Sequence, residues 1–136
     1  MKYSRSEARE KIMIILYQHF LYRKDKIEHS IDDIIKENMQ IQDDFVKKMV
    51  FGVLDKEKNV DAMIDKYMTD WTIKRLGLVD QAIFKMSTYE LLYTDTPHIV
   101  SINEGIELSK KYSDEKIVKL LNGVLDKIYD VEVKHE

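Results

Sequence analysis

The stretch from Leu78 to Thr94, with the sequence LVDQAIFKMSTYELLYT, decides the fold class of this chain. Its apolar residues Val79, Ile83 and Met86 recur every three or four positions, which is the spacing of one face of an α-helix. A glycine precedes the stretch and Pro97 follows it. Glycine favours helix ends, and proline cannot continue a helix. The pattern therefore predicts one long helix that begins after the glycine and ends before Pro97.

The same period runs through the rest of the chain, and residues that can cap a helix precede most of its apolar runs. The expected caps are the boxes Ser4 with Glu7 and Ser101 with Glu104, and the single residues Ser30, Asp43 or Asp44, and Ser113. Asn59 either caps a further helix or lies inside a long bent one. One proline and four glycines leave few strand turns, so we expect an all-α fold.

The composition fits one globular domain. A length of 136 residues suits a single domain, or two small subdomains that share a core. The absence of cysteine excludes a disulfide framework and a cysteine-ligated zinc site. No apolar run approaches the ~18–20 residues of a membrane span, and the start of the chain lacks the pattern of a signal peptide. We therefore expect a cytoplasmic protein without a membrane segment.

The charges are unevenly distributed although the formal net charge is only −3. Residues 1–11 carry four basic and two acidic side chains, and residues 110–127 carry five basic and three acidic ones. Residues 25–44 carry seven acids against two lysines. Such segregation can steer an anion to one face of a protein. Ordinary solvated helix faces would give the same pattern, so the charges alone leave both interpretations open.

The residues assemble no recognisable catalytic or metal-binding motif. The glycines are isolated, so there is no phosphate-binding loop. The histidines His19, His29, His98 and His135 are scattered, and His19 lies on a core-facing position of its helix, as a packed, hydrogen-bonded residue would. Glu90 and Glu104 either form a carboxylate pair or are separate acids held by backbone or tyrosine hydrogen bonds or by a helix cap. We expect no enzymatic activity, no cofactor and no metal.

Two stretches combine lysines with polar residues among apolar neighbours, namely residues 103–112 and 120–127. The polar residues Glu104, Asn122 and Asp126 would each need a partner if they were buried. The lysines of the same segments are typical of a surface that contacts a polyanion. Together these features favour a binding protein.

Five pieces of the sequence then carry a family resemblance. They are Ala8-Arg9-Glu10, Trp71-Thr72-Ile73 with Arg75-Leu76 and Val79-Asp80, Tyr89-Glu90-Leu91, Ile102-Asn103-Glu104 with Ile106-Glu107-Leu108, and Asn122-Gly123-Val124-Leu125-Asp126-Lys127. In this order and spacing they resemble the NusB family of transcription antitermination factors, and the resemblance runs over nearly the whole chain.

The resemblance implies an all-α fold of about seven helices in two small helical bundles packed across each other. The single domain, 1–136, would divide into an N-terminal subdomain of about 1–58 and a C-terminal subdomain of about 59–136. Proteins of this kind are not enzymes. They bind boxA-type single-stranded RNA of ribosomal RNA operons together with NusE, a small-subunit ribosomal protein, and with other Nus factors help RNA polymerase resist termination. Some relatives dimerise, so a homodimer stays open.

The resemblance also implies where RNA binds. The expected RNA-binding residues are Lys2, Arg5, Arg9, Lys116, Lys119, Asn122 and Lys127. Arg5 and Arg9 lie four positions apart, so we expect both to be exposed on one side of the first helix and to converge with the lysines of the last helix in a single patch. Asn122 either contacts RNA or ties two helices together.

Leu120 stands where the family often has an aromatic residue. If that aromatic stacks on a base, its loss costs roughly 1–3 kcal/mol. If it packs in the core, leucine is an acceptable replacement.

The expected NusE-binding residues are Trp71, Leu76, Asp80 and Ile83. Asp80 would face a basic ribosomal protein, and Trp71 is either an apolar contact or a core anchor. Two other functions stay open. One is a helical adaptor that binds only protein. The other is an RNA-targeting domain like that of ribosomal RNA methyltransferases, for which a chain of 136 residues leaves no cofactor-binding domain.

Overall fold

The computed structural model describes residues 2–134, and between them the chain forms helices and no strand. The α-helices are α1 (Arg5–Lys24), α2 (Ile31–Asn38), α3 (Asp44–Asp55), α4 (Glu57–Tyr67), α5 (Leu78–Tyr93), α6 (His98–Tyr112) and α7 (Glu115–Ile128). A short 3-10 turn, η1 (Ile73–Arg75), precedes α5, and a π-helical turn, η2 (Tyr129–Val133), follows α7. The expected all-α fold of seven helices is confirmed. None of the described helices is long and apolar enough to cross a membrane.

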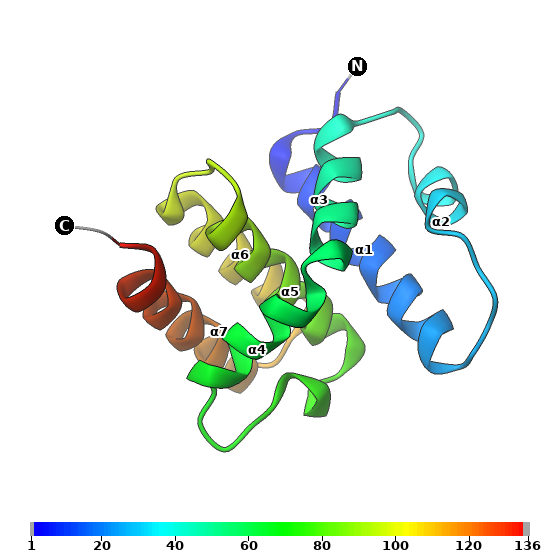
Figure 1. Ribbon diagram of the computed structural model, residues 1–136. Helices are drawn as coiled ribbons and strands as arrows, with labels where there is room; N and C mark the ends of the chain where they lie inside the picture. The colour runs from blue at the N-terminus through cyan, green and yellow to red at the C-terminus, as the bar shows by residue number, and fades with distance from the viewer. Residues whose placement is uncertain (1, 135–136) are drawn as a thin grey trace.

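Figure 1 shows α1, α2 and α3 grouped on one side of the molecule and α4, α6 and α7 on the other, with α5 running between them. Helix α5 packs against α1, α3, α4, α6 and α7. Its core residues Ile83 and Phe84 are almost completely buried. A helix that is covered on most of its sides has buried residues around most of its circumference, and α5 accordingly buries every residue from Ala82 to Thr88.

Two glycines let neighbouring helices approach α5 closely. A Cβ atom added to Gly52 of α3 would overlap the ring of Tyr89, and one added to Gly105 of α6 would lie 2.5 Å from Oγ of Ser87. Both partners belong to α5. Gly52 and Gly105 thus allow one helix from each bundle to pack closely against α5.

The predicted helix starts are confirmed in the N-terminal half. Ser4 and Glu7 form the expected capping box, with backbone-to-side-chain distances of 2.9 and 3.1 Å. Ser30 and Asp43 cap α2 and α3. The chain bends at Lys56 between α3 and α4, and Asn59 lies inside α4. The bend comes two residues before the predicted division at residue 58, which itself stays a prediction.

Two predicted caps in the C-terminal half are wrong. Helix α6 begins at His98, directly after Pro97, so Ser101 is buried inside the helix and forms no capping box with Glu104. Proline favours the start of a helix because its φ angle is already helical. Helix α7 is capped by Asp114, whose Oδ1 accepts from the Ile117 amide at 2.9 Å, and not by Ser113.

A buried ion cluster joins the two bundles near the far end of α1. The side chain of Lys85 on α5 is 3% exposed, and its ammonium group lies 2.6 Å from Oε2 of Glu57 and 3.3 Å from Oδ1 of Asp61, both on α4. Arg23 of α1 donates two hydrogen bonds to the same Glu57. Burial alone would raise the pKa of Glu57, but the hydrogen bonds from Arg23 and Lys85 lower it to about 2. The carboxylate therefore stays charged and holds three helices together.

Candidate nucleic-acid interface

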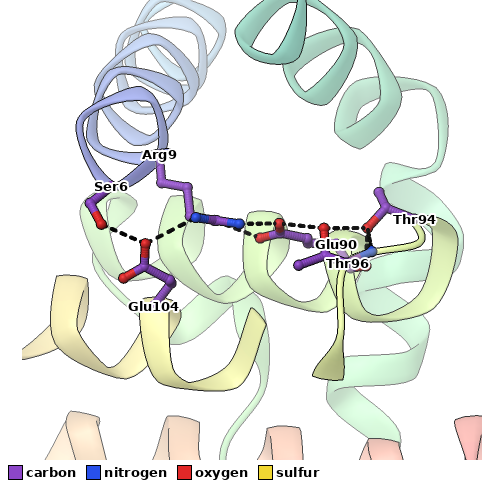
Figure 2. Close-up of polar contacts among 6 residues, drawn as sticks. All are labelled: Ser6, Arg9, Glu90, Thr94, Thr96 and Glu104. Atoms are coloured by element: carbon purple, nitrogen blue, oxygen red, sulfur yellow. Dashed lines mark hydrogen bonds and ion pairs between the residues drawn. The ribbon is translucent and has the colours of Figure 1, made fainter. Parts of the chain in front are cut away.

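Arg9 of α1 lies between two carboxylates of the C-terminal bundle (Figure 2). Its Nε and Nη2 donate to both oxygens of Glu90, at 2.9 and 2.6 Å, and its Nη1 donates to Oε1 of Glu104 at 2.9 Å. Arg9 is 5% exposed and Glu90 is 2% exposed. Such a bidentate pair is the strong form of a charged hydrogen bond, and here it connects α1 with α5 and α6.

Hydroxyl groups extend this network at both ends. The Ser6 hydroxyl donates to Glu104 at 2.6 Å, and the Thr96 hydroxyl donates to Glu90 at 3.0 Å. Figure 2 shows the polar side chains in one row, from the start of α1 across to the turn between α5 and α6. Burial tends to lower the pKa of Arg9, but its hydrogen bonds to Glu90 outweigh that effect and raise the pKa. Arg9 is therefore a permanent cation inside the protein.

The predicted exposure of Arg9 is wrong, because its side chain is buried in this network. The neighbouring residue one turn earlier behaves as expected: Arg5 is exposed, and its guanidinium carbon lies 4.0 Å from the centre of the Phe45 ring. The interpretation of Glu90 and Glu104 as a carboxylate pair is corrected too, since an arginine separates them. Neither acid receives a tyrosine or backbone hydrogen bond within the described residues.

A groove of about 490 Å³ lies beside the network, between the two bundles. From the N-terminal bundle it is lined by Arg5, Phe45 and Lys48, among others. Tyr89 and the start of α6 line the opposite wall. Phe45 and Lys48 stand three residues apart on α3, which places them on one face of that helix. The groove thus combines aromatic surface with two exposed cations.

The lysines of α7 form a separate cationic surface. Lys116, Lys119, Lys127 and Asn122 are all exposed. The ammonium group of Lys116 lies 5.7 Å from the ring of Trp71, and the Arg75 guanidinium carbon lies 5.6 Å from the same ring. Asn122 is exposed and forms no hydrogen bond within residues 2–134, so the structure does not support the interpretation that it ties two helices together. Asp126 is exposed as well, so neither it nor Asn122 needs a buried partner.

The predicted convergence of the first and last helices in one cationic patch is wrong. Figure 1 shows the start of α1 near the top of the view and the start of α7 near the bottom, so the two starts do not adjoin. Arg5 is the first residue of α1, and Lys116 is the second residue of α7. Of the cations expected to bind RNA, Lys2 and Arg5 therefore stand at the start of α1 and a second group stands along α7, where Lys116 lies near Trp71. An RNA strand that reaches both groups must run along the molecule.

The four residues expected to bind a partner protein differ in exposure. Leu76 and Ile83 are buried, 5% and 0% exposed, which corrects their predicted place on a contact surface. Trp71 is half-buried and packs against the core. Asp80 is half-buried, and its carboxylate accepts a hydrogen bond from the Ser113 hydroxyl. Of the four, Trp71 and Asp80 keep accessible surface. Leu120, which replaces the aromatic residue, also packs against the core.

The histidines are less scattered in space than in the sequence. His19 and His29 meet, with 2.6 Å between Nδ1 of His19 and Nε2 of His29, and Nδ1 of His29 lies 2.8 Å from the Ile27 carbonyl oxygen. Because a carbonyl only accepts, His29 carries its proton on Nδ1 and its Nε2 accepts from His19. Burial and the nearby Arg23 charge lower the pKa of His19 to about 4. His19 is thus the packed, hydrogen-bonded residue that its position indicates. His135 lies outside the described residues.

Sequence reasoning did not single out Phe45, Lys48 or Arg75 as functional residues. Phe45 has the spacing of a core residue, and Lys48 looks like any solvated lysine on α3. A signal was present in their three-residue spacing, since an aromatic and a cation on one helix face are a common pairing at nucleic-acid sites. The spacing of Phe45 and Lys48 can be recognised as a binding feature only once the opposite wall of the groove is known.

Comparison with known proteins places the chain among bacterial transcription factors. A model of the NusB family matches residues 6–130. The transcription antitermination protein NusB of Listeria monocytogenes is 44% identical over 126 residues, which is 91% of this chain and 94% of that protein. NusB of Bacillus pumilus is 39% identical with similar coverage, 91% and 93%. NusB of Lactococcus lactis is 51% identical over 83 residues, 60% of this chain and 43% of that protein.

Solved structures agree with these relatives. The structure of NusB from T. maritima superposes with a TM-score of 0.86 at 28% identity, covering 98% of this chain and 96% of that one. A structure of the antitermination factors NusB and NusE in complex with dsRNA superposes with a TM-score of 0.78 at 27% identity, covering 93% and 96%.

Proposed function

The chain belongs to the NusB family, and from that premise we propose that it binds boxA-type RNA together with NusE and, with other Nus factors, makes RNA polymerase resist termination. It is a transcription antitermination factor. The observation that carries this conclusion is the extent of the match, which reaches 91% of this chain and 94% of a curated NusB protein. The solved relative that holds both NusE and RNA supports the same partners. Because transcription is its setting, we place the protein in the cytoplasm, and we propose that it has no enzymatic activity.

The RNA-binding residues in this proposal are exposed cations at two places. Lys2 and Arg5 stand at the start of α1, and the α7 group consists of Lys116, Lys119 and Lys127, with Asn122 beside them. Lysine and arginine side chains of this kind neutralise phosphates and supply most of the affinity for a nucleic acid. Arg9 is not among the RNA contacts in this proposal, because its guanidinium is hydrogen-bonded to Glu90 and Glu104. Its role is to hold α1 in position against α5 and α6.

For NusE we propose Asp80 and Trp71 as the contact residues, on the C-terminal subdomain of about 59–136. Asp80 would face a basic protein surface, and Trp71 offers half-buried aromatic area with two cations next to it. Leu76 and Ile83 support this surface from below as core residues.

The first test is a titration of boxA-type RNA into the protein, alone and with NusE, at several salt concentrations. We expect weak binding by the protein alone and tighter binding with NusE. A scrambled RNA of the same length serves as the control. Equal affinity for both RNAs would contradict a boxA-reading function, and NusE binding that is indifferent to RNA would favour a protein-only adaptor.

Single substitutions test the assigned cations. Arg5→Ala and Lys116→Ala should each weaken RNA binding and reduce the slope of log affinity against log salt by about 1, because each removes one cation from the surface that attracts the RNA phosphates. Lys36→Ala is the matched control, since Lys36 is also exposed but stands in the acidic segment of α2. All three variants should melt within a few degrees of the native protein. Asp80→Asn should weaken NusE binding, and Asp55→Asn, at the exposed end of α3, should not.

A further inference from the structure

The groove between the bundles is lined by Arg5, which the proposed function uses, and by residues that it does not use, Phe45 and Lys48 among them. It is open to solvent, and its N-terminal wall carries Arg5 stacked at 4.0 Å over Phe45, with Lys48 on the same face of α3. The opposite wall carries Val100 and Pro97 of the α6 start, and Val100 is 41% exposed. Apolar surface exposed beside two cations fits a ligand that is flat and apolar in one part and anionic in another.

We propose that this groove is a binding subsite for a single unpaired nucleotide of RNA, with the base inserted between the Arg5–Phe45 stack and Val100 and the phosphate held by Lys48. The inference rests on the proposed RNA-binding function and adds a specific pocket to it. Unpaired bases in RNA complexes stack on aromatic rings and on arginine guanidinium planes. The guanidinium of Arg5, whose carbon lies 4.0 Å from the centre of the Phe45 ring, offers such a plane.

The charges on the two sides of the groove determine which way the bound nucleotide is oriented. Arg5 and Lys48 stand on the α1 and α3 side, while Asp95 is exposed in the turn between α5 and α6 on the other side. Asp95 has no ion pair or hydrogen bond among the described residues. A phosphate is attracted to the first side and repelled by the second. The base edge, with its hydrogen-bond donors, therefore points toward Asp95.

The Arg9 network explains why the groove can keep its shape. Arg9 and Glu104 line it, and their ion pair fixes α1 against α6. Gly52 contributes from the α3 side, since its missing side chain leaves room for Tyr89, which also lines the groove. The two walls belong to different bundles and are joined by buried contacts, so the subsite is formed before RNA arrives. A preformed site avoids the ordering cost that a mobile loop would add to binding.

Two pairs of neighbouring residues allow matched variants. Lys48→Met removes a cation from the groove, and Lys47→Met removes the same charge from the next position, which is exposed and does not line the groove. Val100→Trp fills the groove, and Ile99→Trp adds the same ring at a neighbouring position that is 61% exposed and outside it. Both members of each pair lie on the surface, so all four variants should fold.

The experiment measures binding of boxA-type RNA in the presence of NusE, with the native RNA and with a set of RNAs that each lack one base. Against the native protein, loss of one particular base should weaken binding roughly 10-fold, the size of a lost stacking contact. Lys48→Met should weaken binding several-fold and lower the salt slope by about 1, whereas Lys47→Met should do neither. In Val100→Trp that one base should no longer matter, because it cannot enter. In Ile99→Trp it should matter as in the native protein.

Equal effects within either pair of variants, or a base-loss penalty that persists in Val100→Trp, would overturn the subsite. If the groove variants change NusE binding without RNA instead, the groove holds a protein segment and the inference fails. Failure of the proposed function looks different, since native protein with NusE would then bind the boxA-type RNA no better than a scrambled RNA. Native binding with unaffected groove variants removes the subsite alone.

Discussion

Replacing Arg9 by alanine should destabilise the protein strongly. The change removes three charged hydrogen bonds of 2.6–2.9 Å and leaves Glu90, which is 2% exposed, without its cation. Removing one partner of a buried ion pair typically costs about 3–5 kcal/mol, because the remaining charge is stranded in the interior. Since a domain of this kind has a total stability of about 5–15 kcal/mol, Arg9→Ala should lower the free energy of unfolding by at least about a fifth.

Urea unfolding followed by far-ultraviolet circular dichroism measures this loss, and thermal melting should show a drop on the order of 10–20 °C. Arg5→Ala is the control one helical turn earlier. That variant loses only an exposed cation–π contact with Phe45, worth about 0.5–1 kcal/mol. If Arg9→Ala unfolds within 1 kcal/mol of Arg5→Ala, the network does not support the fold and the reasoning is refuted.

Three further changes test other parts of the fold. Gly105→Ala in α6 should destabilise the protein by about 1–3 kcal/mol, because the added Cβ lies 2.5 Å from Oγ of Ser87. Gly123→Ala, whose Cβ has nothing within 4 Å, should instead stabilise α7 by up to about 1 kcal/mol. Urea unfolding measures both changes. Lys85→Met should cost about 1–3 kcal/mol by the same measurement, because Glu57 keeps only its Arg23 partner. The folded pKa of His19, about 4, lies below the ordinary 6.5, so protonation favours the unfolded chain. Stability should therefore be complete above pH 6.5 and fall as the pH drops toward 4, a loss that should shrink in His19→Asn when melting is followed across that range.

The local parts of the fold could be predicted from sequence because they depend on residues that are close together in the chain. The α5 helix follows from its apolar period, and the capping box at Ser4 and Glu7 follows from hydrogen bonds within one turn. The box at Ser101 and Glu104 has the same local pattern, yet it does not form. There Pro97 starts the helix earlier, and Glu104 bonds with residues of α1. A local rule fails where a distant partner competes for the same side chain.

The candidate site was harder to predict, because its residues are joined by contacts across the chain. Helical spacing correctly puts Arg5 and Arg9 on one side of α1. It cannot tell that α5 and α6 cover the second position and leave the first free. The partners of Arg9 are 81 and 95 positions away in sequence. Burial of a charged residue is decided by such contacts, whereas its exposure is the ordinary expectation.

These contacts also explain why the sequence supports the family resemblance although the predicted exposure of Arg9 is wrong. Arg9, Glu90 and Glu104 each belong to one of the sequence pieces that carry the resemblance, and in the structure they meet in one network. The distinctive residues therefore hold the two bundles together. The exposed cations around Arg5 and Trp71 are less distinctive, because any long basic side chain can neutralise a phosphate. Affinity for RNA can thus change between relatives while the fold stays the same.

Arg9 could support RNA binding by positioning the helices or by contacting the RNA directly. A variant that restores stability without the ion pair distinguishes these two roles. Arg9→Met combined with Glu90→Leu replaces the bidentate pair with apolar side chains, which is often nearly neutral for stability, and Glu104, which is 25% exposed, can still be hydrated. If Arg9 acts only by positioning the helices, this double variant should regain most of the stability lost in Arg9→Met and bind boxA-type RNA with NusE about as tightly as the native protein. Recovered stability together with RNA binding that stays at least 10-fold weaker would mean that the guanidinium itself reaches the RNA.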